Sequence, residues 1–287
     1  MTKVSERGAL RVRGRELPWG HRTYIMGIVN LSADSFSGDG AHGVDAAVAR
    51  AFAQRDAGAD ILDLGAESTR PGHRPIDAAT ELARLVPVVE RVRAADPDAI
   101  LSIDTFKPEV YRCAHASGGD MLNSIWGASD EAIAVCGETN SAIVVMHNKA
   151  VAVYEVDVVD EVLRFLLEAG TRAVRAGLAP ERVILDPGIG FGKLPEHNLA
   201  ILQALERFVA LGFPTMVGTS RKSTIGKLTG RDVDARAFGT AATVALAARA
   251  GIDIVRVHDV GEQRDVVRVT DAIARGWRPD DWLESLP

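Results

Sequence analysis

A carboxylate and three glycines share one short segment of this chain, Asp186-Pro-Gly-Ile-Gly-Phe-Gly-Lys193. The segment directly follows the apolar run Val183–Leu185, so it predicts a buried strand that ends in a carboxylate on a tightly folded loop. Such a carboxylate can accept two hydrogen bonds from an amidine-like edge, the donor pattern of a 2-amino-4-oxo-pyrimidine or guanine ring. The glycines alone could equally form an ordinary turn, so the chemistry depends on what lies beside them.

Seven other apolar runs also end in polar residues that could reach a ligand. These ends are Asn30, Asp63 with Glu67-Ser-Thr-Arg70, Asp104, Asn123, His147, Ser220-Arg-Lys222 and Arg256-Val-His258. Loops that follow parallel strands meet at the carboxyl-terminal mouth of a (β/α)8 barrel, where barrel enzymes have their active sites. An open, doubly wound sheet is the alternative fold, but it gathers function at one switch point, whereas here every strand end carries a polar group.

Short apolar runs alternate with amphipathic stretches along the chain, which predicts a parallel sheet with helices outside it. The predicted strands are Tyr24–Val29, Ile61–Leu64, Ile100–Ile103, Met121–Leu122, Ala142–Val145, Val183–Leu185, Thr215–Val217 and Ile252–Val255. The predicted helices include Gly43–Ala57, Ala78–Ala95, Pro108–Ser117, Val158–Ala176, Asn198–Leu211 and Ala235–Ala250. Several of them end at a glycine suited to a left-handed cap, namely Gly58, Gly118, Gly177, Gly212 and Gly251. We therefore expect an α/β fold, a single-domain TIM barrel over residues 23–287 that follows an N-terminal extension over residues 1–22.

The composition is ordinary for a globular protein and limits the possible partners. Of the 287 residues, 47% are hydrophobic and 25% charged, and the net charge of -6 is spread over mixed signs. Such a chain offers no long-range field for nucleic acid or an acidic membrane face. Its two cysteines, Cys113 and Cys136, lack metal-ligand spacing, and no targeting or membrane-spanning segment is visible. We expect a cytoplasmic protein with neither nucleic acid nor membrane as a partner.

Three polar residues at the ends of predicted strands could form one hydrogen-bonding wall. Asp104 ends the third run, Asn123 the fourth and Asp186 the sixth. Each of them alone could be a polar core residue with satisfied hydrogen bonds. Together they would line a planar slot, which an apolar barrel would not otherwise tolerate.

Two further segments are suited to anionic groups. Gly218-Thr-Ser-Arg-Lys-Ser223 opens a predicted helix, so backbone N–H groups, hydroxyls and two cations could bind a carboxylate or phosphate there. Helix capping with two solvated cations is the alternative for that segment. Arg256 and His258 alternate along the last strand and therefore share a face. With Asn30 opposite, they could hold a pyrophosphate and a hard metal ion such as Mg2+.

His147 ends the fifth run. No pair of histidines in the sequence has zinc-site spacing. We expect a packed or hydrogen-bonded histidine here rather than a metal ligand.

These motifs together resemble the dihydropteroate synthase family, whose members join 6-hydroxymethyl-7,8-dihydropterin pyrophosphate to p-aminobenzoate. Seven ordered groups of residues carry the resemblance and span about Thr23 to Ala274. They are Ile25-Met-Gly-Ile-Val-Asn30 with Asp34-Ser-Phe36, Gly58-Ala-Asp-Ile-Leu-Asp63, Glu67-Ser-Thr-Arg-Pro-Gly72, Ser102-Ile-Asp-Thr105 with Lys107-Pro108, the segment from Asp186 to Lys193, Ser220-Arg-Lys-Ser223, and Arg256-Val-His-Asp-Val260. The resemblance implies a (β/α)8 barrel, a homodimer, Mg2+ as cofactor, and a transferase of folate biosynthesis.

Carried over motif by motif, the resemblance implies a role for each matching residue. The residues expected to contact the pterin ring are Asp104, Asn123, Asp186 and Lys222, with Met146 and Phe191 as apolar neighbours. The ring would also stack on Arg256, and the pyrophosphate would be held by Arg256, His258 and Asn30, with Asn30 binding Mg2+. The expected mobile loops contain Asp34 in the first and Thr69, Arg70 and Pro71 in the second. The carboxylate of p-aminobenzoate would bind at Ser223. The expected catalytic set is Asp34, Arg70, Lys222, Arg256 and His258.

The chain departs from the family's usual pattern in the first loop and after Asn123. The loop reads Asn30-Leu-Ser-Ala-Asp-Ser-Phe-Ser-Gly-Asp-Gly40, where threonine-proline usually precedes the aspartate, and Ser124 stands where an aspartate is usual. These changes concern loop closure and turnover more than pterin binding. A pterin-binding paralogue without synthase activity is therefore one alternative. A methyltetrahydrofolate-dependent methyltransferase is another, although that related barrel lacks the pairing of Ser-Arg-Lys with Arg-Val-His found here.

Overall fold

Parallel strands form a closed barrel. The structure is a computed structural model that describes residues 7–31, 40–67, 75–280 and 282, and within these ranges eight strands form one sheet in the order β8-β7-β6-β5-β4-β3-β10-β9. The strands are β3 (Tyr24–Asn30), β4 (Ile61–Gly65), β5 (Ile100–Asp104), β6 (Met121–Ser124), β7 (Ala142–Met146), β8 (Val183–Asp186), β9 (Met216–Val217) and β10 (Ile254–Val257). A parallel bridge between Leu185 and Thr215 connects β8 to β9 and closes the sheet. The predicted single-domain (β/α)8 fold is confirmed.

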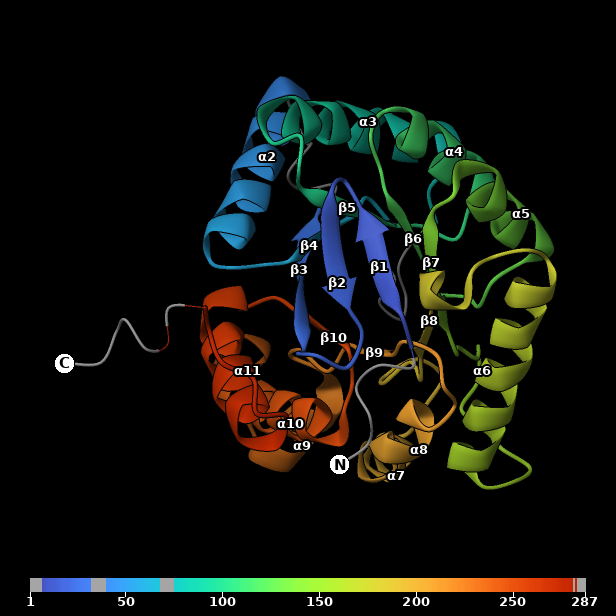
Figure 1. Ribbon diagram of the computed structural model, residues 1–287, viewed down its shortest axis with the longest axis vertical. Helices are drawn as coiled ribbons and strands as arrows, with labels where there is room; N and C mark the ends of the chain where they lie inside the picture. The colour runs from blue at the N-terminus through green and yellow to red at the C-terminus, as the bar shows by residue number, and fades with distance from the viewer. Residues whose placement is uncertain (1–6, 32–39, 68–74, 281, 283–287) are drawn as a thin grey trace.

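Helices surround this barrel on the outside (Figure 1). They are α2 (Gly40–Asp56), α3 (Ala78–Ala95), α4 (Pro108–Ala116), α5 (Asp130–Thr139), α6 (Val158–Arg175), α7 (Pro195–Gln203), α8 (Leu205–Val209), α9 (Ser223–Thr229), α10 (Ala237–Ala250) and α11 (Val260–Ala274), with 3-10 turns η1 (Pro180–Arg182) and η2 (Val233–Ala235). The predicted helix over 198–211 is divided at Ala204 into α7 and α8, and α5 and α11 were not among the predicted helices. The predicted left-handed glycines are confirmed by positive φ at Gly58, Gly118, Gly177, Gly212 and Gly251. No helix within the described residues is long and apolar enough to cross a membrane.

Alternate strand residues face either the helices or the barrel interior. On β3, Ile25 and Val29 pack in the layer against the helices, whereas Tyr24 and Met26 pack inside. The interior residues of the other strands are Ile61, Ile100, Met121, Ala142, Val144, Ile184, Met216 and Ile254. Most of these are the first residue of their strand, so apolar packing fills the amino-terminal end of the barrel and leaves the polar groups to the other end.

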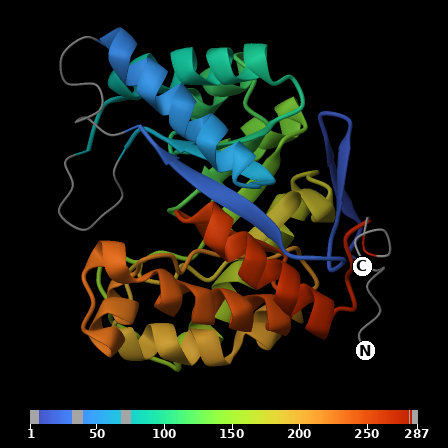
Figure 2. The same ribbon diagram turned by 90° about the vertical axis from the view of Figure 1, so that its left-hand side faces the viewer.

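A hairpin of β1 (Ala9–Val12) and β2 (Arg15–Pro18) covers that amino-terminal end (Figures 1 and 2). Its side chains Leu10 and Leu17, together with Trp19, belong to the interior apolar cluster and are buried. Part of the expected N-terminal extension is therefore packed onto the barrel.

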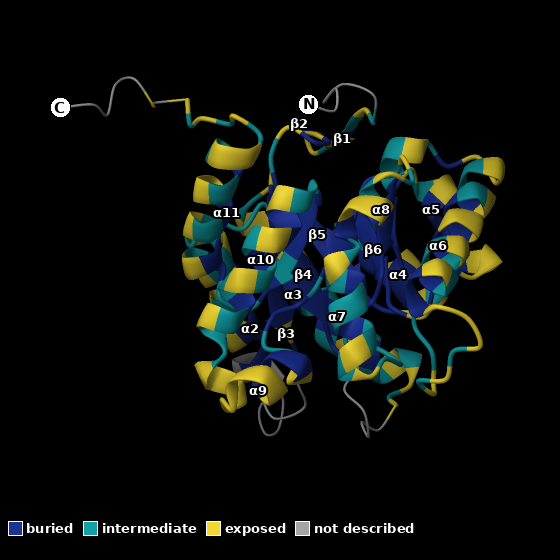
Figure 3. Cartoon of the chain, turned by 90° about the horizontal axis from the view of Figure 1, so that it is seen from below, coloured by how far each residue is buried: buried dark blue, intermediate teal, exposed yellow. Residues whose placement is uncertain are grey.

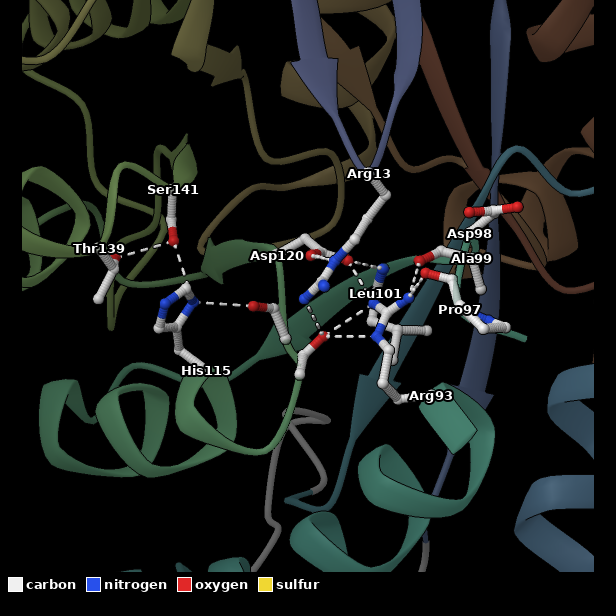
Figure 4. A network of polar contacts seen from close by, with 12 residues as sticks. Arg13, Arg93, Pro97, Asp98, Ala99, Leu101, His115, Asp120, Thr139 and Ser141 are labelled. Carbon is white, nitrogen blue, oxygen red and sulfur yellow. Dashed lines mark hydrogen bonds and ion pairs between the residues drawn. The ribbon is translucent and has the colours of Figure 1, made fainter. Parts of the chain in front are cut away.

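A buried carboxylate fastens the hairpin to the barrel (Figure 4). Asp120, just before β6, accepts hydrogen bonds from Nε of Arg13 at 2.6 Å and from Nη2 of Arg93 at 2.7 Å. It also accepts from the backbone N–H of Leu101 at 2.9 Å. Because Arg13 lies in the hairpin turn and Arg93 on α3, one carboxylate connects the hairpin, a helix and two strands.

We expect Trp19→Ala to lower the free energy of unfolding by about 3–5 kcal/mol, the usual cost of deleting a large buried aromatic side chain. The Trp19 ring packs edge-on against Tyr24 with centroids 5.9 Å apart, and its indole N–H donates to the carbonyl of Glu181 at 2.9 Å. Urea denaturation measures the change. The matched control is Arg11→Ala, because Arg11 forms an exposed ion pair with Glu16 on the same hairpin. A loss no larger than in that control would show that the hairpin contributes little to stability.

Candidate active site

Four polar residues near the carboxyl ends of the strands form one hydrogen-bonded network. Oδ2 of Asp63 on β4 accepts from the side-chain amide of Asn123 at 3.1 Å and from Nε of Arg256 at 2.6 Å. Nη2 of Arg256 donates to Oδ2 of Asp104 at 2.6 Å. The network joins β4, β5, β6 and β10. The sequence placed Asp63 at a strand end but gave it no role, and its contact with Arg256 is formed only in the folded structure.

Three oxygens of this network are buried without a hydrogen-bond donor. They are Oδ1 of Asp63, Oδ1 of Asp104 and Oδ1 of Asn123. A buried acceptor without a donor costs free energy that a suitable ligand can recover. The arrangement therefore favours a ligand that brings several N–H groups on one edge.

Burial controls the charges of this site. It raises the pKa of Asp104 to about 7, although the neighbouring Arg256 guanidinium opposes the shift. It likewise raises the pKa of Asp186 to about 6 against a hydrogen bond from the backbone N–H of Gly188 at 2.7 Å. Burial would lower the pKa of Arg256, but Asp63 and Asp104 together raise it above its ordinary value. Arg256 is therefore always charged, while both carboxyls titrate near neutral pH.

The glycine loop after β8 turns as its sequence predicts. Gly188, Gly190 and Gly192 all have positive φ, of 70°, 81° and 58°. A Cβ atom at Gly188 would lie 2.0 Å from the carbonyl oxygen of His147, so no other residue fits there. The loop thus lies directly against the end of β7.

The loop also approaches the start of α9. Nζ of Lys222 lies 3.9 Å from the centroid of the Phe191 ring, in a cation–π contact. Ser223 begins α9 and is exposed, and Lys222 precedes it without a side-chain cap. These three residues, all expected at the site, therefore lie next to one another at the mouth.

The sequence suggested Arg221 as a second cation for an anion, but its guanidinium group contacts carboxylates of the protein. Its Nε contacts Asp259 at 3.1 Å and its Nη1 contacts Asp234 at 2.9 Å. Two carboxylates therefore pair with the guanidinium group of Arg221 in this structure.

The residues expected to hold pyrophosphate lie at the ends of two adjacent strands. His258 directly follows β10, and Ser220 Oγ lies 3.1 Å from its backbone nitrogen and 3.0 Å from its Nδ1. Asn30 ends β3 with an exposed side chain. Since β3 pairs with β10, both residues lie at the same edge as Arg256.

His147 is a packed histidine, as predicted. Its Nδ1 is 2.9 Å from Nζ of Lys193, and its ring lies 5.0 Å from that of Phe165 and 6.4 Å from that of Tyr154. Burial lowers the pKa of His147 to about 3, so it is neutral. Met146, the preceding residue, is buried at the end of β7.

Four of the expected site residues, Asp34, Thr69, Arg70 and Pro71, lie outside the described residues.

Comparison with known proteins identifies the family. A family model described as pterin binding enzyme matches residues 26–258. A dihydropteroate synthase of Clostridium beijerinckii is 40% identical over 93% of this chain and 100% of its own length. Among solved structures, the dihydropteroate synthase of Xanthomonas albilineans with 4-aminobenzoic acid has a TM-score of 0.87 at 40% identity, covering 98% of this chain and 100% of that one. The same enzyme with 7,8-dihydropteroate has a TM-score of 0.83 at 39% identity, covering 97% and 100%.

The chain belongs to the dihydropteroate synthase family. Its activity is the transferase activity of that family. The buried oxygens of Asp63, Asp104 and Asn123 are among the described groups with unused acceptor capacity, and they lie together near the strand ends.

We expect this enzyme to bind a pterin without pyrophosphate more weakly as the pH falls. An ionised carboxylate accepts N–H groups more strongly than a protonated carboxyl, and the pKa is about 7 for Asp104 and about 6 for Asp186. Affinity should fall by about tenfold or more between roughly pH 8 and pH 5.5, since each pH unit below a linked pKa changes it by up to tenfold. Isothermal titration calorimetry across this range measures the change, and a flat profile would contradict it.

The stability of the free enzyme should respond to pH in the opposite direction. Folding raises both pKa values from 3.8, so the folded state holds more protons than the unfolded state between that value and about 7. The stabilising contribution of these two groups is therefore fully present in acid and is lost as the pH rises through the folded values.

Proposed function

We propose that the mouth of the barrel binds the pterin ring edge at Asp104, Asn123 and Asp186 and joins the pterin to p-aminobenzoate. The observation that carries this proposal is the group of buried acceptors without donors on Asp63, Asp104 and Asn123. A 2-amino-4-oxo-pteridine presents N–H donors on one edge, which suits such acceptors. The related enzyme solved with 7,8-dihydropteroate supports the same ligand class.

The proposed reaction breaks the bond between the pterin methylene carbon and a pyrophosphate oxygen, and the electron pair leaves on pyrophosphate. Arg256 and His258 would stabilise the negative charge that grows there. The electron-rich reduced pterin would delocalise the resulting positive charge while Asp104, Asn123 and Asp186 hold the ring in place. The neutral arylamine then attacks the carbon and loses a proton, so no protein nucleophile or strong base is required. The enzyme contributes mainly position and order.

The second substrate would enter beside Phe191 and the start of α9. Lys222 is held over the Phe191 ring next to the exposed Ser223, and its charge acts on Asp104 and Asp186. We propose Lys222 for the pterin ring and Ser223 for the carboxylate of p-aminobenzoate. The proposed loop contacts of Asp34 and Arg70 rest on the sequence motifs alone.

Mg2+ is the proposed cofactor, and the residues fit an ion that takes few protein ligands. The amide oxygen of Asn30 is a hard donor on an exposed side chain beside the end of β10. Among the described residues, no three His, Cys, Asp or Glu side chains group as a metal cage. The ion would be held by Asn30, pyrophosphate and water, and when bound it supplies Lewis-acid stabilisation of the leaving charge.

Removing Mg2+ with EDTA should abolish turnover and leave binding of a pterin without pyrophosphate almost unchanged. The reason is that the proposed ion contacts the pyrophosphate and Asn30, and does not contact Asp104, Asn123 or Asp186. Activity is measured as pyrophosphate release, with Mg2+ added back as the control. Full activity in the presence of chelator would refute this assignment.

The decisive test of the function is pyrophosphate release from the pterin pyrophosphate, with and without p-aminobenzoate. A synthase should release pyrophosphate in strict dependence on p-aminobenzoate and form dihydropteroate in equal amount. Asp186→Ala should weaken binding of the pterin by about 2–4 kcal/mol, because the ring would lose a charge-assisted acceptor. Pterin binding without turnover would instead indicate the paralogue that has lost synthase activity, which the altered first loop makes the second candidate.

A homodimer is the proposed assembly, supported by an exposed apolar surface on α10 and α11. Phe238 and Leu246 on α10 are 91% and 55% exposed, and Val269 and Ile273 on α11 are 61% and 77% exposed. The two helices pack side by side (Figure 3). Such a surface suits self-association better than contact with water.

Phe238→Asp should convert the proposed dimer to a monomer, because a charge within an apolar interface is left desolvated and unpaired. Analytical ultracentrifugation at several concentrations measures the mass. Leu194→Asp is the control, since Leu194 is also exposed but lies at the start of α7. An unchanged mass in Phe238→Asp would exclude this surface as the interface.

We also propose that the enzyme works in the cytoplasm. Cys113 and Cys136 are both free thiols, and Cys136 is buried. This state suits a reducing compartment.

A further inference from the structure

Lys193 closes the glycine loop through three hydrogen-bond contacts of its Nζ atom. Nζ lies 2.9 Å from Nδ1 of His147, 3.2 Å from the His147 carbonyl oxygen and 3.0 Å from the carbonyl oxygen of Phe191. The backbone N–H of His147 in turn donates to the Asp186 carbonyl at 2.9 Å. Lys193 therefore ties the loop after β8 to the end of β7 at the residue that bonds to Asp186.

Phe191 is consequently held from two sides. Its carbonyl oxygen accepts from Lys193, and its ring lies under the ammonium group of Lys222 at 3.9 Å. The backbone on either side of Phe191 is also held, since the Gly190 N–H donates to Oδ1 of Asn198 at 2.8 Å and the Gly192 carbonyl accepts from the Tyr154 hydroxyl at 2.8 Å. Loss of Lys193 would leave the Phe191 carbonyl without its donor.

The charge of Lys193 also acts on Asp186. Lys222, Lys193 and Arg256 are the cations that oppose the effect of burial on the Asp186 carboxyl. Lys193 itself is strongly desolvated, which lowers its pKa to about 7, while Asp186 is the main charge that opposes this shift. Other groups near Lys193 are Lys222, Glu161 and Lys149, and its direct partner His147 is neutral.

We propose that Lys193 is a positioning residue of the pterin site, which fixes Phe191 in the loop and supplies a positive charge that keeps Asp186 ionised. The proposal rests on the function proposed above. The positive charge of Lys193 opposes the protonation of Asp186 that burial favours. Asp104, Asn123 and Asp186 therefore keep accepting hydrogen bonds into mildly acid solution.

The test compares the pH dependence of pterin binding in four variants. The probe is 6-hydroxymethylpterin, which lacks pyrophosphate, and its affinity is measured by calorimetry from about pH 5.5 to 8.5 in the full-length enzyme. Lys193→Gln keeps hydrogen-bond donors but removes the charge, Lys193→Met removes both, and Lys193→Arg keeps the charge. Lys149→Met is the matched control, because Lys149 is a nearby cation paired with Glu161 at 2.8 Å and is not among the main charges that act on Asp186.

We expect the acid limb of binding to move to higher pH in Lys193→Gln and Lys193→Met. The direction follows because removing a positive neighbour raises the pKa of a carboxyl group. The loss of affinity should be about three- to tenfold near pH 6 and less than about twofold near pH 8, where Lys193 is already largely neutral in the parent enzyme. Lys193→Met should add a loss that is the same at all pH values, while Lys193→Arg and Lys149→Met keep the parent acid limb. In the reaction with both substrates, the KM for the pterin substrate should rise, whereas kcat should stay within about twofold of the parent value.

The proposal would be overturned if the acid limb of binding in Lys193→Gln coincided with that of the parent enzyme. A purely structural role of Lys193 predicts this result. If Lys193→Met does not fold, the comparison of Lys193→Gln with Lys193→Arg still decides. Failure of the parent enzyme to bind the pterin would refute the proposed function instead, so the two failures are distinguishable.

Discussion

The mouth of the barrel depends on the two ion pairs of Arg256. It contacts two carboxylates at once, Asp63 and Asp104, in a region where Asp63 has no exposed surface. Two buried anions so close to each other require a cation between them, and removing one partner of such a network costs on the order of 3–5 kcal/mol. Because these three residues come from β10, β4 and β5, the ion pairs also fix the relative position of those strands. The acceptor oxygens are thus arranged before any ligand arrives.

The two ends of the barrel use buried aspartates in different ways. At the amino-terminal end, Asp253 accepts from Arg7, from the backbone N–H groups of Gly20 and Thr215, and from the Thr215 hydroxyl. At the carboxyl-terminal end, Asp63 and Asp104 each keep one oxygen without a donor. The carboxylate of Asp253 uses its oxygens for hydrogen bonds within the protein, which stabilise the fold. One oxygen each of Asp63 and Asp104 stays available to a ligand. This division matches the general separation of stability and function between the ends of such barrels.

The sequence predicted the barrel because each strand is a compact apolar run and each polar end follows its strand directly. It did not predict the hairpin, since β1 and β2 are four residues each and only Leu10 and Leu17 within them are buried. The helices α5 and α11 were not among the predicted helices, and neither length nor apolar periodicity separates them from α4 and α10, which were. At the site, the role of Asp63 and the contact of Lys193 with His147 depend on side chains that are brought together only by folding. Sequence motifs name the residues of such a site, but which of them pair with one another is decided in three dimensions.

Burial gives this site both its selectivity and its pH sensitivity. An exposed carboxylate would be ionised at any physiological pH, but it would bind an N–H edge weakly because water competes for the same oxygens. Burial removes that competition and at the same time raises the pKa of Asp104 and Asp186 toward neutrality. The arylamine of the proposed reaction is neutral over this whole range and needs no base, so the nucleophile does not limit activity in acid. If the proposed function holds, Asp104 and Asp186 set the acid side of the enzyme's working range, and the cations Arg256, Lys222 and Lys193, which oppose the effect of burial, extend it.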